Sequence, residues 1–83
     1  VTEVERVGGW CLKLPAIHNA GLPDRLCLFP GGEVVFVELK AFGKKPRKIQ
    51  TLMHQKLKAM GFRAEVIDTT MGCKMLALEY DRK

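Results

Sequence analysis

The sequence has few of the features that define disulfide-rich, zinc-binding or membrane-spanning chains. It holds three cysteines, an odd number, and none lies in a C-x-x-C pair or at a paired cysteine and histidine spacing. Neither a disulfide framework nor a structural zinc site is therefore expected. No stretch approaches the roughly 18 apolar residues that can span a bilayer, and no N-terminal segment resembles a signal peptide. We expect a soluble protein without a membrane partner, in a reducing cytoplasm.

The chain also lacks internal repeats, low-complexity tracts and Ser/Gly linkers, so its 83 residues are interpreted as one domain, 1–83. So short a domain buries only about 60 to 65% of its extended-chain surface, which makes oligomerisation a plausible source of added stability. Acidic residues are scarce, with 9 Asp plus Glu against 14 Lys plus Arg and a net charge of +5. This balance favours a polyanionic partner, nucleic acid first, although many small basic domains bind none.

Hydrophobic patterning predicts short elements separated by glycine and proline. Helices are expected over residues 1–7 and 46–60, and strands over residues 10–14, 25–29, 33–40 and 62–68. Apolar residues give the second helix an amphipathic face formed by Ile49, Leu52, Met53, Leu57 and Met60. Residues 69–80 are ambiguous, because Thr69 or Thr70 suits the cap of a third helix that Gly72 weakens.

The order of these elements indicates the fold class. The turn Pro30-Gly31-Gly32 joins two apolar runs into an antiparallel hairpin. Strand, helix and strand over residues 33–68 then form a βαβ unit, whose crossover is right-handed and whose strands are parallel. The fold class is therefore α/β with an α+β-like mixed sheet, in which the hairpin lies beside the parallel pair and helices flank the sheet.

Charged residues at the ends of two predicted strands indicate chemistry. Glu38 and Lys40 lie on one face at the end of the strand 33–40, about 6.6 Å apart along it. Asp24, placed after Pro23 at the start of the partner strand, offers a second carboxylate. We expect it to come near Glu38 only if the strands splay or the register is offset, and the sequence leaves this open.

Two carboxylates at this position suit Mg²⁺, which takes oxygen ligands and completes its octahedron with water and phosphate oxygens. The backbone carbonyl of Leu39 is a further candidate ligand, and Lys40 is placed to orient the attacking water or to stabilise negative charge on a phosphate. The alternative is a surface pair of Glu38 and Lys40 with Asp24 in a turn, because the E-x-K triplet alone is common.

Beyond the triplet, the segment "GLPDRLCLFPGGEVVFVELKAFGKKPRKIQTLMHQKLKAMGFRAEVID" resembles the virus-type replication-repair nuclease (VRR-NUC) domain of the PD-(D/E)XK nuclease superfamily. The matching features are G-x-P-D-R from Gly21 to Arg25, E-x-K from Glu38 to Lys40, and Gln50 early in the following helix. The pattern at Gly8, Gly9 and Lys13 and the segment from Gly61 to Asp68 extend the resemblance over roughly residues 3 to 68.

The resemblance implies a restriction-endonuclease-like core and a set of catalytic residues: Asp24, Glu38, Lys40 and Gln50. Asp24 and Glu38, with the Leu39 carbonyl, would hold Mg²⁺ or Mn²⁺, and Lys40 would be the catalytic lysine. The family also has a metal-approaching glutamate on its first helix. In this sequence Glu3 and Glu5 are available, and both lie closer to Gly8 and Gly9 than the family position normally does. The role is assigned to Glu3, and the alternative is that the family glutamate precedes residue 1.

The resemblance further implies a substrate and a setting. Family members that consist of this domain alone look like homodimers of phages and bacteria that cut branched DNA such as four-way (Holliday) junctions. The expected function is therefore a metal-dependent, structure-specific endonuclease of DNA repair type, acting in the cytoplasm of a bacterium or a phage-infected host cell. Flaps or other branched DNA are alternative substrates, and a DNA-binding module of the same fold that does not cut is the alternative function.

Basic and aromatic residues near the predicted site are candidates for DNA contact. The cationic candidates are Lys13, Arg25, Lys44, Lys45, Arg47 and Lys48. Trp10 and Phe42 could stack on unpaired bases, although Trp10 suits the core or a dimer contact better. His54, one turn after Gln50, either faces the site or is an ordinary helix residue.

Overall fold

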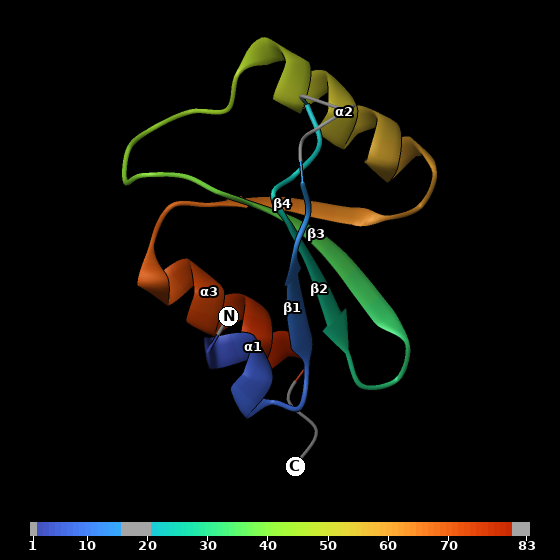
Figure 1. Cartoon of the computed structure of the whole chain (residues 1–83), viewed down its shortest axis with the longest axis vertical. Coiled ribbons are helices and arrows are strands. Elements are labelled where there is room, and N and C mark those ends of the chain that lie inside the picture. The colour runs from blue at the N-terminus through green and yellow to red at the C-terminus, as the bar shows by residue number, and fades with distance from the viewer. Residues whose placement is uncertain (1, 16–20, 81–83) are drawn as a thin grey trace.

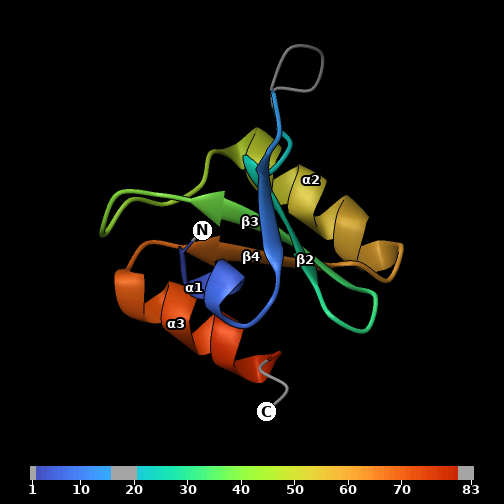
Figure 2. The same cartoon turned by 60° about the horizontal axis from the view of Figure 1, so that its bottom comes forward.

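The structure, a computed structural model, describes residues 2–15 and 21–80 as a four-stranded mixed sheet with helices on both faces (Figure 1). The elements are α1 (Thr2–Arg6), β1 (Trp10–Lys13), β2 (Arg25–Phe29), β3 (Glu33–Leu39), α2 (Lys48–Ala59), β4 (Arg63–Ile67) and α3 (Thr70–Glu79). The strand order is β1-β2-β3-β4, with antiparallel pairing up to β3 and parallel pairing between β3 and β4. The predicted mixed sheet is thus confirmed. Helix α2 covers one face, and α1 and α3 lie together on the other (Figure 2).

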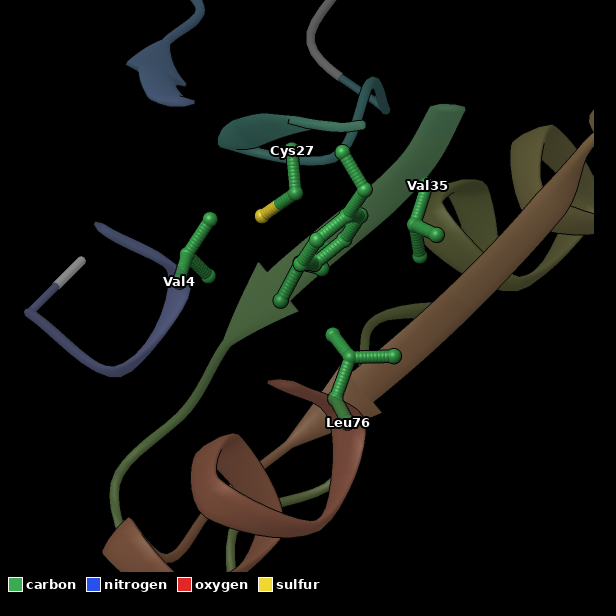
Figure 3. Close-up of a cluster of buried hydrophobic side chains, with 6 residues drawn as sticks. Val4, Cys27, Val35 and Leu76 are labelled. Carbon is green, nitrogen blue, oxygen red and sulfur yellow. The ribbon is translucent and has the colours of Figure 1, made fainter. Parts of the chain in front are cut away.

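The main core lies between the sheet and the pair α1 and α3. Val35 and Val37 point to this side of β3 and are 0% and 2% exposed. They belong to a buried cluster completed by Val4, Cys27, Phe29 and Leu76 (Figure 3). Phe29 also stacks on Tyr80, with ring centroids 4.2 Å apart, which ties the end of α3 to β2. This packing holds β2 and β3, the two strands that carry the predicted site.

The face of α2 that packs on the sheet agrees only in part with the apolar face that the sequence pattern predicted. Its buried residues are Gln50, His54 and Leu57, so Leu57 is buried as predicted, whereas Ile49 and Leu52 are 47% and 55% exposed. One cause lies beneath the helix, where the buried carboxylate of Glu38 accepts a hydrogen bond from Gln50 and thereby holds this polar side chain inward. Hydrophobic periodicity predicts which apolar residues face the core. It does not predict polar residues that turn inward to bond with a buried charge.

Gly21 allows the segment before β2 to approach α2 closely. A Cβ atom at this position would lie 2.8 Å from the carbonyl oxygen of Ile49 and 2.9 Å from its Cγ1. Because the first of these contacts is with backbone, a side chain at position 21 would displace α2 or the segment that leads into Asp24. The glycine of the G-x-P-D-R motif is therefore needed for helix packing.

Helix α3 resolves the ambiguity of residues 69–80. Thr69 is the N-cap, and its Oγ1 accepts a hydrogen bond from the backbone N–H of Gly72 at 2.9 Å. The glycine has a packing reason, because a Cβ at position 72 would lie 2.9 Å from Cγ2 of Ile67. The glycine lowers the helix propensity of this segment, but it allows α3 to pack closely on β4.

We expect Thr69→Ala to lower the free energy of unfolding by about 1 kcal/mol, because the N–H of Gly72 loses its acceptor. For a domain of this size the melting temperature should fall by about 4 to 8 °C. Thr70→Ala is the matched control, since Thr70 is exposed and lies one residue inside the helix. Equal losses in the two variants, measured by thermal unfolding, would contradict the capping role.

None of the helices within residues 2–15 and 21–80 has the length and apolar character needed to cross a membrane.

Candidate active site

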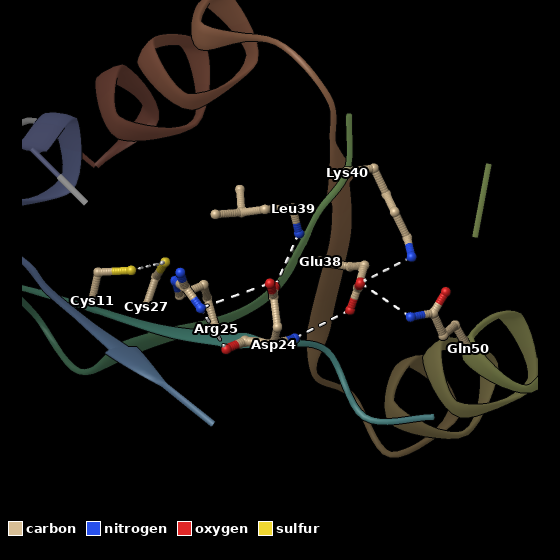
Figure 4. A network of polar contacts seen from close by, with 8 residues as sticks. All are labelled: Cys11, Asp24, Arg25, Cys27, Glu38, Leu39, Lys40 and Gln50. Atoms are coloured by element: carbon tan, nitrogen blue, oxygen red, sulfur yellow. Dashed lines mark hydrogen bonds and ion pairs between the residues drawn. The ribbon is translucent and has the colours of Figure 1, made fainter. Parts of the chain in front are cut away.

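The site is built around Glu38, at the end of β3, whose side chain faces α2 although it carries a charge. The residue is only 5% exposed. Its Oε1 accepts the backbone N–H of Asp24 at 3.1 Å, and its Oε2 accepts from Nε2 of Gln50 at 3.0 Å and lies 3.3 Å from Nζ of Lys40 (Figure 4). Three donors from three segments therefore hold one buried carboxylate, which is how a charge is tolerated in a protein interior.

Asp24 lies across from Glu38 without any distortion of the hairpin. The register pairs Phe29 with Glu33 and Arg25 with Val37, so the next pair along the ladder is Asp24 and Glu38. The expectation that the strands must splay or shift was therefore wrong. The three-residue turn between β2 and β3 already sets the register that brings the carboxylates together.

The carboxylate of Asp24 is oriented by its neighbours. Oδ1 accepts the backbone N–H of Leu39 at 3.0 Å, and Oδ2 lies 3.7 Å from Nη1 of Arg25. The same Nη1 donates to the Asp24 backbone carbonyl at 3.2 Å. The residue before Asp24, Pro23, has a fully buried side chain. With Oδ1 committed to the backbone, Oδ2 is the oxygen most open to a ligand.

Gln50 connects the start of α2 to the carboxylate. Its Oε1 accepts the backbone N–H of Arg47 at 2.8 Å, and its Nε2 donates to Glu38. The first bond satisfies one of the free N–H groups at the helix N-terminus and fixes which end of the amide faces the site. Gln50 therefore orients Glu38 while it caps the helix.

Lys40 projects from the residue that follows β3, on the same face as Glu38, as the alternation of the strand predicted. Its backbone N–H donates to the Ile67 carbonyl at 3.0 Å, which anchors it to β4. Its side chain is 19% exposed, so the ammonium group is partly shielded yet reachable from solvent. The structure thus brings Asp24, Glu38, Lys40 and Gln50 together.

The oxygen atoms of this site fit a hard divalent cation. The structure brings together two carboxylates, Asp24 and Glu38, and Mg²⁺ needs only one or two carboxylates when water and phosphate supply the rest. The ligand role of the Leu39 carbonyl stays a prediction. Among residues 2–15 and 21–80 no group of three or more His, Cys, Asp and Glu side chains is placed to hold a metal.

Glu3, the assigned first-helix glutamate, is not gathered with these two carboxylates. Its Oε1 lies 3.5 Å from Nη1 of Arg6, and it lines a cavity of about 220 Å³ on the α1 and α3 side of the sheet. Arg25 and Leu39 line the same cavity, so the first helix faces the back of the site. The ligand role of Glu3 stays a prediction.

His54 is the site neighbour that sequence reasoning left undecided. It is 7% exposed, on the buried face of α2, and its Nε2 has no hydrogen-bond partner among the described residues. Burial lowers its pKa, against the opposing field of Glu38, so the imidazole is held neutral. A neutral ring beneath the helix adds no positive charge to compete with a cation at Glu38. The i to i+4 spacing from Gln50 was the available sequence signal.

The predicted DNA-contacting cations differ in their exposure to solvent. Five of them are exposed: Lys13, Lys44, Lys45, Arg47 and Lys48. The last four lie in the loop after β3 and at the start of α2, next to Lys40, whereas Lys13 ends the edge strand β1. Arg25 differs, because its guanidinium is half-buried against Asp24. Its position suits orientation of that carboxylate.

Comparison with known proteins agrees with this geometry. No family model matches the sequence. The chain is 41% identical over 69 residues to "Putative nuclease p44" of Acyrthosiphon pisum secondary endosymbiont phage 1, a match that covers 83% of this chain and 74% of the phage protein. Its fold matches a solved structure described as "VRR_NUC domain" with a TM-score of 0.85 and 29% identity, over 95% of this chain and 86% of that one.

Fold, site and relatives define a nuclease. More narrowly, the chain belongs to the VRR-NUC family, which confirms the resemblance found in the sequence.

Proposed function

We propose that this nuclease is a metal-dependent endonuclease that hydrolyses phosphodiester bonds in branched DNA, four-way junctions foremost, and that it acts as a homodimer. The observation that carries the proposal is the convergence of Asp24, Glu38, Lys40 and Gln50 at one end of β3. A domain that only bound DNA would have no need for a buried carboxylate held by three donors. Burying this carboxylate removes its hydration, which costs free energy, and a catalytic role explains why the fold tolerates that cost.

In this proposal Asp24 and Glu38 hold Mg²⁺ or Mn²⁺, with the Leu39 carbonyl as a further ligand. When bound, such a cation lowers the pKa of a coordinated water and neutralises charge on the scissile phosphate. Gln50 keeps the Glu38 carboxylate turned toward the cation. Lys40 donates from its ammonium to the attacking water or to a phosphate oxygen, where negative charge develops.

The cationic loop after β3 and the start of α2 supply the DNA contacts. Lys44, Lys45, Arg47 and Lys48 are exposed and follow Lys40 by four to eight residues in the sequence, so they are candidates to bind phosphates of a DNA strand that enters the site. Cations at the start of a helix are slightly unfavourable with respect to the helix dipole, which favours a binding role for them over a structural one. Affinity should fall steeply with salt, because each phosphate contact releases a counterion.

A homodimer is supported by exposed apolar residues on α3. Met71, Met75 and Leu78 are 64%, 61% and 63% exposed. Apolar residues that lie together on a surface are typical of protein interfaces. A two-fold dimer presents two active sites in opposed orientation, which suits a junction with near two-fold symmetry. The phage relative supports a cell infected by a phage as the setting.

The test is cleavage of a labelled four-way junction beside linear duplex, flap and single-stranded DNA, with Mg²⁺, Mn²⁺ or EDTA. We expect paired symmetric nicks in the junction with either metal and none in EDTA. Cleavage of flaps in preference to junctions would replace the substrate while leaving the nuclease in place. Metal-independent binding without a cut in any substrate would contradict the catalytic proposal and leave a DNA-binding relative.

A further inference from the structure

Phe42 is the most exposed large apolar residue in the part of the chain that the structure describes. Its exposed fraction is 82%, against 61% for Trp10 and 64% for Met71. It lies two residues after Lys40, in the loop between β3 and α2 that reaches beyond the end of the sheet (Figure 2). Such an exposed phenyl ring, two residues after the proposed catalytic lysine in the sequence, stabilises the fold little, because it packs on little of it.

The loop that carries Phe42 has a defined shape. The N–H of Lys44 donates to the Ala41 carbonyl at 2.9 Å, which closes a turn with Phe42 and Gly43 at its two central positions. Gly43 has φ +79°, as the third residue of a type II turn requires. Its N–H donates to Oδ2 of Asp68 at 3.2 Å, which anchors the turn to the connection between β4 and α3. The phenyl ring is thus presented from an anchored corner.

Charge and shape around this corner favour nucleic acid over an apolar protein surface. Lys44 and Lys45 follow Phe42 directly, and both are exposed. An apolar interface would have to desolvate these ammonium groups, whereas a DNA strand pairs them with phosphates and offers an aromatic base to the ring. At the base of the loop Lys40, Asp68 and Thr70 line a shallow, open depression of the surface, so no other described part of the fold covers this side of Lys40.

We propose that Phe42 stacks on an unpaired or unstacked base next to the scissile phosphate, and so selects branched DNA over continuous duplex. The inference rests on the proposed endonuclease function and identifies a specificity-determining residue for it. In a continuous duplex each base is already stacked on both sides, so the ring finds no free face. At a branch point the base stack is interrupted, and the phenyl ring replaces the missing neighbour.

The test compares Phe42→Ala and Phe42→Trp with the wild type, and with Met60→Ala as a matched loss of an exposed apolar side chain at the far end of α2. Binding to a four-way junction and to linear duplex is measured with Ca²⁺ in place of Mg²⁺, and 2-aminopurine at the branch point reports stacking. We expect Phe42→Ala to weaken junction binding about 10-fold or more and duplex binding less than 2-fold. The 2-aminopurine quenching should be lost when Phe42 is replaced by alanine, kept when it is replaced by tryptophan, and unchanged in Met60→Ala.

Three results would overturn the stacking role. Equal weakening on junction and duplex makes Phe42 a general contact, and unchanged quenching in Phe42→Ala excludes stacking at that base. A fall from dimer to monomer in sedimentation of Phe42→Ala makes the ring a subunit contact. All these readouts measure binding, so a wild type that stacks on the branch but never cuts DNA contradicts the endonuclease function alone.

Discussion

Glu38→Gln should abolish cleavage while the fold persists. The variant removes the negative charge that, with Asp24, would hold the cation, and several kcal/mol of charge stabilisation in the transition state correspond to about a 10³-fold loss of rate. It also costs stability. All three groups around the carboxylate are donors, so the new amide NH₂ must face one of them, at about 1 to 3 kcal/mol.

Loss of activity and loss of fold are separated by a matched control and a linkage measurement. Glu33→Gln changes the same residue type at the exposed start of the same strand, and it should cut DNA like the wild type. Mg²⁺ should raise the melting temperature of the wild type and of Glu33→Gln, because a ligand that binds only the folded state stabilises it. The same shift in Glu38→Gln, or cleavage within 10-fold of the wild type, would show that Glu38 is not a metal ligand.

The sequence was sufficient for the fold because its local signals agree with each other. The proline and glycine turn after Phe29, the alternation of residues 33–39 and the glycine after α2 each specify the element that the structure contains. The sequence signals for the ends of the first helix and for the presence of α3 were weaker. In α3 the glycine at position 72 lowers helix propensity for a packing reason, contact with Ile67, that only the folded chain reveals.

The site could be predicted only in part. The sequence identified Asp24 and Glu38 as candidate carboxylates, but whether they lie next to each other depends on the register of the hairpin, which the sequence left open. A shift of one residue would have turned one carboxylate to the other face of the sheet. The inward face of α2 was predicted only in part: Leu57 is buried as expected, but a hydrophobic pattern cannot show that Gln50 turns inward to donate to a buried carboxylate. That long-range demand comes from Glu38, which is 12 residues before Gln50.

Lys40→Met should lower cleavage about 10² to 10³-fold while leaving the cation site in place. Methionine keeps the length of the side chain and removes the ammonium group that would stabilise charge on the phosphate. Lys40→Arg should not restore the rate, because the planar guanidinium places its donors differently from a compact ammonium. Lys56→Met, at an exposed position of α2 remote in sequence from the loop, is the matched control.

Lys40→Met and Glu38→Gln should differ in their affinity for Mg²⁺. This difference distinguishes a lysine that acts on the phosphate from one that only positions a carboxylate. In the wild type Nζ of Lys40 lies 3.3 Å from Oε2 of Glu38 and competes with a cation for that oxygen. Removing the ammonium should therefore leave Mg²⁺ binding as tight as in the wild type or tighter, whereas Glu38→Gln should weaken it. Titration calorimetry with Mg²⁺ measures both. If Lys40→Met weakens Mg²⁺ binding as much as Glu38→Gln does, the lysine serves to position Glu38, and the charge on the phosphate must be stabilised by another group, such as one of the cations of the loop.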